Sequence, residues 1–297
     1  MQKEVEENID KFYYYLKHQK KYSENTITAY IKDITYFYEY LKCDIKLNND
    51  DISKYLVHLY NDLKLSKSSI GRKLSSLRSF YNYLLREEII NINYFEDVSN
   101  PKKPLLLPKY LKDDEVNKIF SVCMNNDNIS IRDRVIIELL YSSGIRVSEL
   151  VNIKLLDINF KDKEIKVLGK GEKERIVMFN DSCMEALKIF INEVRPKIYK
   201  KENGYLFIGR NNGHISAKSI RDILNKIRIK AGLEEGLHPH LFRHTFATDM
   251  LNNGADLVSV KELLGHESLN TTSIYTHVSD EHIRKIYDMA HPRAKKE

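Results

Sequence analysis

The stretch SNPKKPLLLPKYLKDDE, residues 99–115, constrains the fold more than any other part of this 297-residue chain. It contains three prolines, is basic and shows neither helical nor strand periodicity. Proline fixes φ and lacks a backbone N–H donor, so a stretch of this kind interrupts regular structure and is typical of a linker between domains. We therefore predict two domains, at residues 1–98 and 112–297, joined by a linker at 99–111.

The first domain is predicted to be a small bundle of four helices. In each of four segments, apolar side chains recur at the three- and four-residue spacing that places them on one helix face. Ser23 precedes the second segment and is a suitable N-cap. The segments are residues 6–19, 23–42, 51–63 and 66–88. Their short connections favour neighbouring helices packed around one core.

Basic side chains occupy the faces of the fourth helix that lie away from its apolar stripe. They include Lys67, Arg72, Lys73 and Arg78. A charged helix face is commonly just a face in contact with solvent. The alternative is a helix laid against a DNA backbone, where lysine and arginine contact phosphates and set the position of the protein.

The bulk composition limits the function classes that remain open. The formal net charge is +6, and residues 101–297 supply all of it, with 33 Lys and Arg against 27 Asp and Glu. A mildly basic protein suits a polyanionic partner, although such a charge is common. Three well-separated cysteines, a polar N-terminus and the lack of an apolar run of about 18–20 residues predict a soluble cytoplasmic protein.

The second domain is predicted to be mainly helical with a small antiparallel sheet. An apolar helix ends at Gly144, and a hairpin follows with strands near 165–168 and 175–179 around a turn rich in glycine and lysine. Further helices are expected at about 181–194, 217–231, 239–252, 256–264 and 280–290. Adjacent carboxylates at 113–115 are interpreted as the first turn of a helix rather than as a metal site.

Three side chains in the stretch HPHLFRHTFAT favour a phosphate site. His240, Arg243 and His244 lie three and four residues apart, so they share one face at the start of a helix. Free N–H groups and the helix dipole favour an anion there. An arginine between the histidines would repel a metal ion. For His244, a hydrogen bond inside the core is an equally good interpretation.

Arg146 and Lys170 are candidates to act on the same phosphate. Arg146 opens another helix directly after Gly144 and Ile145, and its planar guanidinium can bind two phosphate oxygens. Taken alone, Arg146 is more often interpreted as an ordinary surface or ion-paired arginine. Lys170 lies in the hairpin turn GKGEKE, from which a lysine could enter a DNA groove and protonate a leaving oxygen. Lys173 is an alternative for that role, and an ordinary solvated lysine is the other interpretation.

His266 and Tyr275 complete the set of candidates. A tyrosine hydroxyl has a pKa of about 10 and is a weak nucleophile until nearby positive charge lowers that pKa. Arginines bound to the phosphate would supply this charge and would also stabilise the transition state. The set needs no carboxylate cluster, so we expect neither a metal ion nor a cofactor.

These motifs together resemble the signature boxes of the tyrosine recombinase (phage integrase) family. The stretches GIRVSEL, LGKGEKER, HPHLFRHTFAT and LLGHESLNTTSIYTHV are similar to them in order and spacing, and the C-terminal tail resembles that of the Xer subgroup. The resemblance covers essentially the whole chain. Phe242 departs from the pattern, since members commonly carry leucine there, and this apolar exchange affects packing more than chemistry.

The resemblance implies a role for each candidate. Arg146, Lys170, His240, Arg243 and His266 match the catalytic positions, and Tyr275 matches the nucleophile that becomes joined to the 3′-phosphate of DNA. It also implies that the two domains form a C-shaped clamp around the duplex, with Lys67, Arg72, Lys73, Arg78 and Lys173 as DNA contacts. No ATP or metal is implied.

The resemblance further implies a tetramer on two DNA sites. The helix near 280–290 would dock in a neighbouring subunit through Ile283, Ile286 and Tyr287, although it could equally pack on its own chain. Resolution of chromosome or plasmid dimers, a step in chromosome partition and cell division, is the leading role. Recombination of a mobile element, DNA inversion, a topoisomerase without strand exchange and a DNA-binding protein without cleavage are the alternatives. The sequence does not define the target site or a paralogous partner.

Overall fold

The structure is a computed structural model that describes residues 3–102, 109–169, 174–265 and 278–294, with the side chains of 49 and 278–280 left out. The chain divides into two compact units, Met1–Leu106 and Leu107–Glu297. Each unit has its own apolar core. The prediction of a mainly helical protein with a small antiparallel sheet is confirmed.

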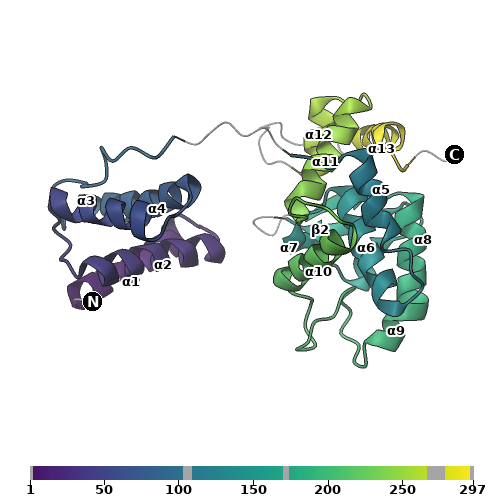
Figure 1. The fold of residues 1–297 in the computed structure, drawn as a ribbon, viewed down its shortest axis with the longest axis horizontal. Coiled ribbons are helices and arrows are strands. Elements are labelled where there is room, and N and C mark those ends of the chain that lie inside the picture. Colours follow the sequence, from purple (N-terminus) through teal and green to yellow (C-terminus); the bar gives the residue numbers. More distant parts are fainter. Residues whose placement is uncertain (1–2, 103–108, 170–173, 266–277, 295–297) are drawn as a thin grey trace. The chain divides into compact units, whose positions relative to one another are not determined.

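All elements of regular secondary structure in the described part of the first unit are helices (Figure 1). Two of its helices continue into π-helical turns, labelled η. The elements are α1 (Lys3–Tyr14), η1 (Tyr15–Gln19), α2 (Glu24–Leu41), α3 (Asn49–Val57), η2 (His58–Asp62) and α4 (Lys67–Arg86). Ser23 caps α2 as predicted, since its hydroxyl accepts a hydrogen bond from the N–H of Thr26 at 3.3 Å. Asn48 and Ser66 cap α3 and α4 in the same manner.

The core of the first unit is built largely from aromatic rings. Phe12, Phe37 and Phe80 are fully buried between α1, α2 and α4. The hydroxyls of Tyr38 and Tyr81 lie 2.7 Å apart, and that of Tyr81 also donates to the carbonyl of Ile45 at 3.1 Å. Buried hydroxyls are costly unless they are hydrogen-bonded, so this pair fixes α2 against α4 in one arrangement.

The second unit surrounds the long buried helix α6 (Figure 1). Its elements before the sheet are α5 (Asp113–Ser121), α6 (Asn128–Ser143), α7 (Val147–Leu150) and η3 (Leu155–Asp157), which is a 3₁₀ helix. Those after the sheet are α8 (Asp181–Ile189), η5 (Phe190–Val194), α9 (Arg195–Ile198), α10 (Ala217–Lys230), α11 (Pro239–Asn252), α12 (Leu257–Leu264) and α13 (Val278–Ala290). α6 packs against α8 on one side and α11 on another.

The sheet is antiparallel in the order β1 (Ile158–Asn159), β2 (Glu164–Leu168), β3 (Glu174–Met178). The predicted hairpin is confirmed, with Ile165 opposite Val177 and Val167 opposite Arg175. The short strand β1 was not predicted, because two residues are too few to show alternation. Ile165, Val167 and Val177 are buried, so this face of the hairpin packs on the core.

The ends of helices α5, α6 and α12 are determined by the residues at those ends. Gly144 ends α6 with φ +57°, as predicted, and Gly265 ends α12 with φ +63°. The acidic stretch Asp113–Glu115 forms the first turn of α5, where the carboxylate of Glu115 accepts the N–H of Lys112 at 2.9 Å. Interpretation of this stretch as a helix start is confirmed.

The C-terminal helix α13 packs on its own chain. Ile283, Ile286 and Tyr287 are buried in a cluster with Phe246 and Met250 of α11. Packing on their own chain, one of the two expectations for these side chains, is therefore what this single chain shows. Docking in a neighbouring subunit stays a prediction. The packing on their own chain removes their apolar area from water, and the hydroxyl of Tyr287 donates to the carbonyl of Ser142 at 2.8 Å.

Among the described residues, no helix has the length and apolar character that a membrane span requires.

Candidate active site

Arg146 lies at the start of α7, where the predicted break after α6 places it. Gly144 adopts the left-handed conformation, and a Cβ on it would lie 2.9 Å from side-chain atoms of both Leu264 and Phe246. The chain turns there without a side chain and delivers Arg146 as the N-cap residue of α7. Its side chain is 31% exposed, so part of the guanidinium remains open to a ligand.

Glu149 holds Arg146 and a second arginine, Arg175 of β3, around one buried carboxylate. Oε1 accepts from Nη1 of Arg146 at 2.8 Å and from Nε of Arg175 at 3.1 Å. Oε2 accepts from the backbone N–H of Arg146 at 2.9 Å and from Nη2 of Arg175 at 2.8 Å. Burial alone would raise the pKa of this carboxyl, but Arg175 and then Arg146 outweigh it and lower the pKa below its ordinary value. Glu149 is therefore ionised at neutral pH.

Arg243 approaches from α11. Its Nη1 donates to the carbonyl of Gly144 at 2.7 Å and its Nη2 to the carbonyl of Leu264 at 2.6 Å. Burial and the positive charges of Arg146 and Arg175 lower the pKa of Arg243 to about 10, so it stays protonated at neutral pH. A guanidinium held near two others is short of negative charge, which favours an anionic ligand.

The three arginines meet at the C-terminal end of α12. Arg175 donates to the carbonyl of Leu263 at 2.9 Å, Arg243 to that of Leu264 and Arg146 to that of Gly265 at 3.0 Å. A helix leaves its last carbonyls without partners inside the helix, and its dipole is negative at this end. Three guanidinium groups from three elements satisfy three successive carbonyls here.

The histidines of α11 lie at the start of the helix. His238 caps it by accepting the N–H of Leu241 at 3.1 Å on Nδ1, and burial together with the neighbouring His240 and His244 lowers the pKa of His238. His240 and His244 are both exposed. Interpretation of His244 as a hydrogen-bonded core residue is therefore wrong, because its position on α11 turns away from the apolar faces.

Four of the predicted site residues lie outside the described residues. They are Lys170, Lys173, His266 and Tyr275. Of the predicted catalytic set, the structure brings Arg146 and Arg243 together at the end of α12 and places His240 on the same helix as Arg243.

The side chains of α4 that are predicted to contact DNA differ in their exposure to solvent and in their partners within the chain. Lys67 is the first residue of the helix and is exposed. Arg72 and Lys73 both pair with Asp33, whose carboxylate is buried, yet Arg72 stays 48% exposed whereas Lys73 is 13% exposed. Arg78 is half-buried and donates to backbone carbonyls of the segment after α4. Lys67 and Arg72 are therefore the most accessible of the four.

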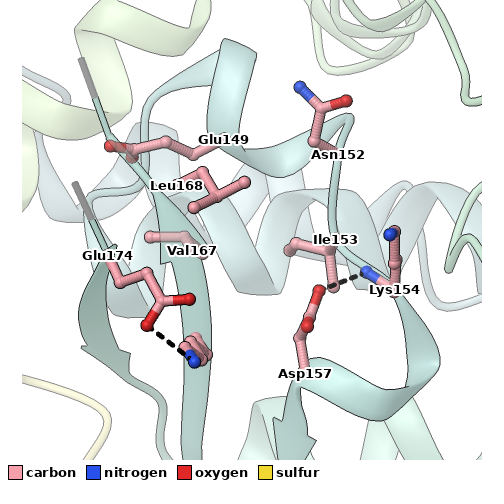
Figure 2. Close-up of a pocket in the computed structure, with 9 residues that line it drawn as sticks. Glu149, Asn152, Ile153, Lys154, Asp157, Val167, Leu168 and Glu174 are labelled. Atoms are coloured by element: carbon pink, nitrogen blue, oxygen red, sulfur yellow. Dashed lines mark hydrogen bonds and ion pairs between the residues drawn. The ribbon is translucent and has the colours of Figure 1, made fainter. Parts of the chain in front are cut away.

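A cavity of about 230 Å³ borders Glu149 between η3 and β2 (Figure 2). Its charged lining is paired internally. Lys166 and Glu174 form an ion pair at 2.7 Å across the hairpin, and Asp157 accepts the backbone N–H of Lys154 at 2.8 Å. These groups in the lining therefore already have partners within the chain.

Sequence reasoning missed Glu149 and Arg175. A signal for Glu149 is present, because it stands three residues after the helix start at Arg146, the spacing of a capping box. Arg175 carries no local signal. It follows a run of charged turn residues, and only the pairing of β3 with β2 turns it toward Glu149.

Comparisons with known proteins agree with this arrangement. Residues 109–282 match the family model described as phage integrase family, and residues 9–88 match the model described as phage integrase, N-terminal SAM-like domain. The chain belongs to the phage integrase family. The tyrosine recombinases XerC of Staphylococcus saprophyticus and Oceanobacillus iheyensis are each 42% identical to it. The alignments cover 98% of this chain and 99% and 98% of the respective relatives.

Solved structures of other family members share the fold. The XerA recombinase matches with a TM-score of 0.50 and 28% identity over 97% of this chain and 99% of its own. The XerH recombinase bound to palindromic difH substrate in a post-cleavage complex matches with a TM-score of 0.67 and 23% identity, over 89% and 79%. The Tn1549 transposon integrase in complex with transposon right end DNA matches with a TM-score of 0.69 and 19% identity. The match covers 95% of this chain and 98% of the integrase chain.

Proposed function

We propose that this chain is a site-specific tyrosine recombinase of the Xer type, which cuts and rejoins double-stranded DNA through a covalent 3′-phosphotyrosine. One observation supports it above the rest. Arg146 and Arg243 come from different helices and converge on the last carbonyls of α12, directly before the sequence that holds His266 and Tyr275. Family membership and the XerC relatives support the same reaction.

In the proposed mechanism the arginines hold the scissile phosphate. Each guanidinium has five N–H donors and uses only some of them within the chain, so both keep donors for phosphate oxygens. His240 and His266 add hydrogen bonds to those oxygens. The positive charge lowers the pKa of the Tyr275 hydroxyl and stabilises the extra negative charge of the transition state.

The covalent step follows from these roles. Tyr275 loses its hydroxyl proton to solvent as its oxygen attacks phosphorus. The bond from phosphorus to the 5′-oxygen breaks, and Lys170 donates a proton to that oxygen, which leaves as a free 5′-hydroxyl. Lys173 is the alternative donor. A 5′-hydroxyl from a second duplex then attacks the phosphotyrosine and releases the tyrosine. One phosphodiester is exchanged for another, so the cycle requires no ATP.

We assign residues 1–98 to DNA binding, 99–111 to a linker and 112–297 to catalysis. Lys67, Arg72, Lys73, Arg78 and Lys173 are the proposed phosphate contacts. Lys67 is exposed and Arg72 is half-exposed, which suits a direct contact. Lys73 would first have to leave Asp33, since the pair buries most of its side chain. Affinity dominated by phosphates should fall steeply with salt.

Assembly as a tetramer on two DNA sites, with copies of this chain or with a paralogous recombinase, completes the proposal. The role that we propose is the resolution of chromosome or plasmid dimers, for which the relatives named XerC are the support. Sites at the ends of a mobile or invertible segment would instead assign the chain to that element.

The test is capture of covalent adducts on genomic DNA from the source cells. Wild-type protein is incubated with the DNA and denatured, and the trapped ends are sequenced, in parallel with Tyr275→Phe and with Tyr110→Phe. Tyr110 is an exposed tyrosine of the same unit and is the matched control. We expect one palindromic site with wild type and Tyr110→Phe and none with Tyr275→Phe. Adducts of equal yield with Tyr275→Phe would refute the assignment.

A further inference from the structure

The end of α12 is held by three arginines, of which the proposed function uses only two. Arg146 and Arg243 have roles at the phosphate, and Arg175 has none. Its side chain is nevertheless firmly held. It donates twice to Glu149 and once to the carbonyl of Leu263, and it is only 13% exposed.

We propose that Arg175 is a positioning residue, which sets the orientation of Arg146 through Glu149 and ties both to the end of α12. This inference rests on the proposed function, because it names a further residue on which the same cleavage step depends. Arg175 itself does not touch the phosphate. It acts through the carboxylate and the helix end.

The geometry of Glu149 carries the first part of the inference. Each of its two oxygens accepts one hydrogen bond from Arg146 and one from Arg175, at 2.8–3.1 Å. With Arg175 removed, the carboxylate would be free to rotate toward Arg146 alone and to bind it more tightly. The guanidinium of Arg146 would then be displaced from its position at the phosphate, and the carboxylate of Glu149 would neutralise more of its charge.

The packing around Gly265 carries the second part. A Cβ on Gly265 would lie 2.6 Å from Cδ and 3.1 Å from Nε of Arg175, so the stem of the arginine fills the space beside that glycine. The carbonyl of Gly265 is the one that accepts from Arg146. Arg175 therefore packs against the same backbone that Arg146 binds, and this packing requires glycine at position 265.

Arg175 also links the hairpin to the helices. It lies on β3, opposite Val167 of β2, whereas Glu149 is on α7 and Leu263 on α12. Its side chain thus joins three elements at one point. A shift of the hairpin would be transmitted to Arg146 and to the end of α12 together.

The experiment measures two quantities for the full-length chain on a duplex that carries the site found by adduct capture. They are the rate constant of adduct formation at saturating duplex and the affinity for the duplex. For Arg175→Gln we expect the rate constant to fall about 100-fold, as for a reacting group misplaced by about 1 Å, with affinity within about threefold of wild type. The rate constant of Arg175→Lys should lie between those of wild type and Arg175→Gln, because a single ammonium group cannot reach both Glu149 and the carbonyl of Leu263.

Arg195→Gln is the matched control. Arg195 is 5% exposed, pairs with Glu202 and donates to the carbonyls of Tyr205 and Leu206, so it is a buried arginine of the same kind away from the site. Its loss should lower the melting temperature without lowering the rate constant of the folded protein. A rate constant for Arg175→Gln within about threefold of wild type, or no lower than that of Arg195→Gln, would overturn the proposal.

A second pair of variants keeps the test decisive if Arg175→Gln does not fold. Gly265→Ala places its Cβ against the stem of Arg175 and should lower the rate constant in the same way. Arg175→Lys with Gly265→Ala should be no slower than the slower single variant, because both changes break one interaction. Independent, multiplicative losses would contradict it. Failure of the wild-type protein to form any adduct would count against the proposed function, not against this inference.

Discussion

Replacement of Glu149 by glutamine should destabilise the second unit more than any other single isosteric change at the site. Glu149 is buried and accepts four hydrogen bonds, all from Arg146 and Arg175. Glutamine keeps the shape but turns one oxygen into an N–H₂ group, which would face two donors. The variant also leaves three guanidinium groups, including that of Arg243, without their shared counter-charge.

The magnitude follows from the hydrogen bonds that the substitution removes. Two of the four disappear, and bonds to charged groups contribute about 1.5–3 kcal/mol each, which gives roughly 3–6 kcal/mol. Removal of one partner from a buried ion pair typically costs about 3–5 kcal/mol. We therefore expect a loss of about 3–5 kcal/mol in the free energy of unfolding. For a unit of this size that corresponds to a melting temperature lower by roughly 6–20 °C.

The assay is urea unfolding followed by circular dichroism, with Glu262→Gln as control. Glu262 lies on α12 and is exposed, so its replacement should change stability by less than about 0.5 kcal/mol. The lowered pKa of Glu149 adds a second signature, because its stabilising contribution is present at neutral pH and is lost as pH falls through the folded-state pKa. The difference between wild type and Glu149→Gln should therefore shrink in acid. A loss below about 1 kcal/mol at neutral pH would refute the role of the carboxylate.

Asp249, Gly144 and Lys67 give three more predictions. Burial raises the pKa of Asp249 to about 6, so the wild-type protein loses stability as pH rises from about 4 toward 7 and this buried carboxyl ionises. Urea unfolding across this range should show the free energy of unfolding of Asp249→Asn rising relative to that of wild type. A difference that stays constant with pH would contradict this. Gly144→Ala places a Cβ 2.9 Å from atoms of Leu264 and Phe246 at φ +57° and should cost about 1–3 kcal/mol in the same assay, whereas a neutral effect would show that the turn can relax. Lys67→Gln should reduce the salt dependence of DNA affinity by about one unit of logarithmic slope, measured by titration at several salt concentrations, and an unchanged slope would remove Lys67 from the interface.

The sequence was sufficient for most of the helices, for the hairpin and for the pair of arginines. Ser23, Gly144 and Pro239 mark helix ends through backbone chemistry that acts locally, so the corresponding boundaries agree with the structure. Arg146 and Arg243 could be paired because each stands at the start of a helix in a recognisable motif. Neither inference needed knowledge of which elements pack together.

Tertiary pairing was what the sequence could not supply. Arg175 points to Glu149 only because β3 pairs with β2 in one register. From the sequence alone, Lys73 is indistinguishable from an exposed surface lysine. In the structure it is mostly buried, because it pairs with Asp33, which lies 40 residues away in the chain. Docking of α13 on its own chain depends on the apolar surface that α11 and α12 present, which no helical periodicity reveals.

The central claim is that Tyr275 becomes joined to a DNA 3′-phosphate, and mass spectrometry of the covalent adduct tests it most directly. Trypsin releases the peptide Glu262–Arg284, in which Tyr275 is the single tyrosine. After nuclease digestion of adducts formed on source DNA, we predict a nucleotide linked through its 3′-phosphate to Tyr275 in that peptide, and a free 5′-hydroxyl on the other DNA end. A nucleotide on a different residue, or a linkage through the 5′-phosphate, would contradict the claim.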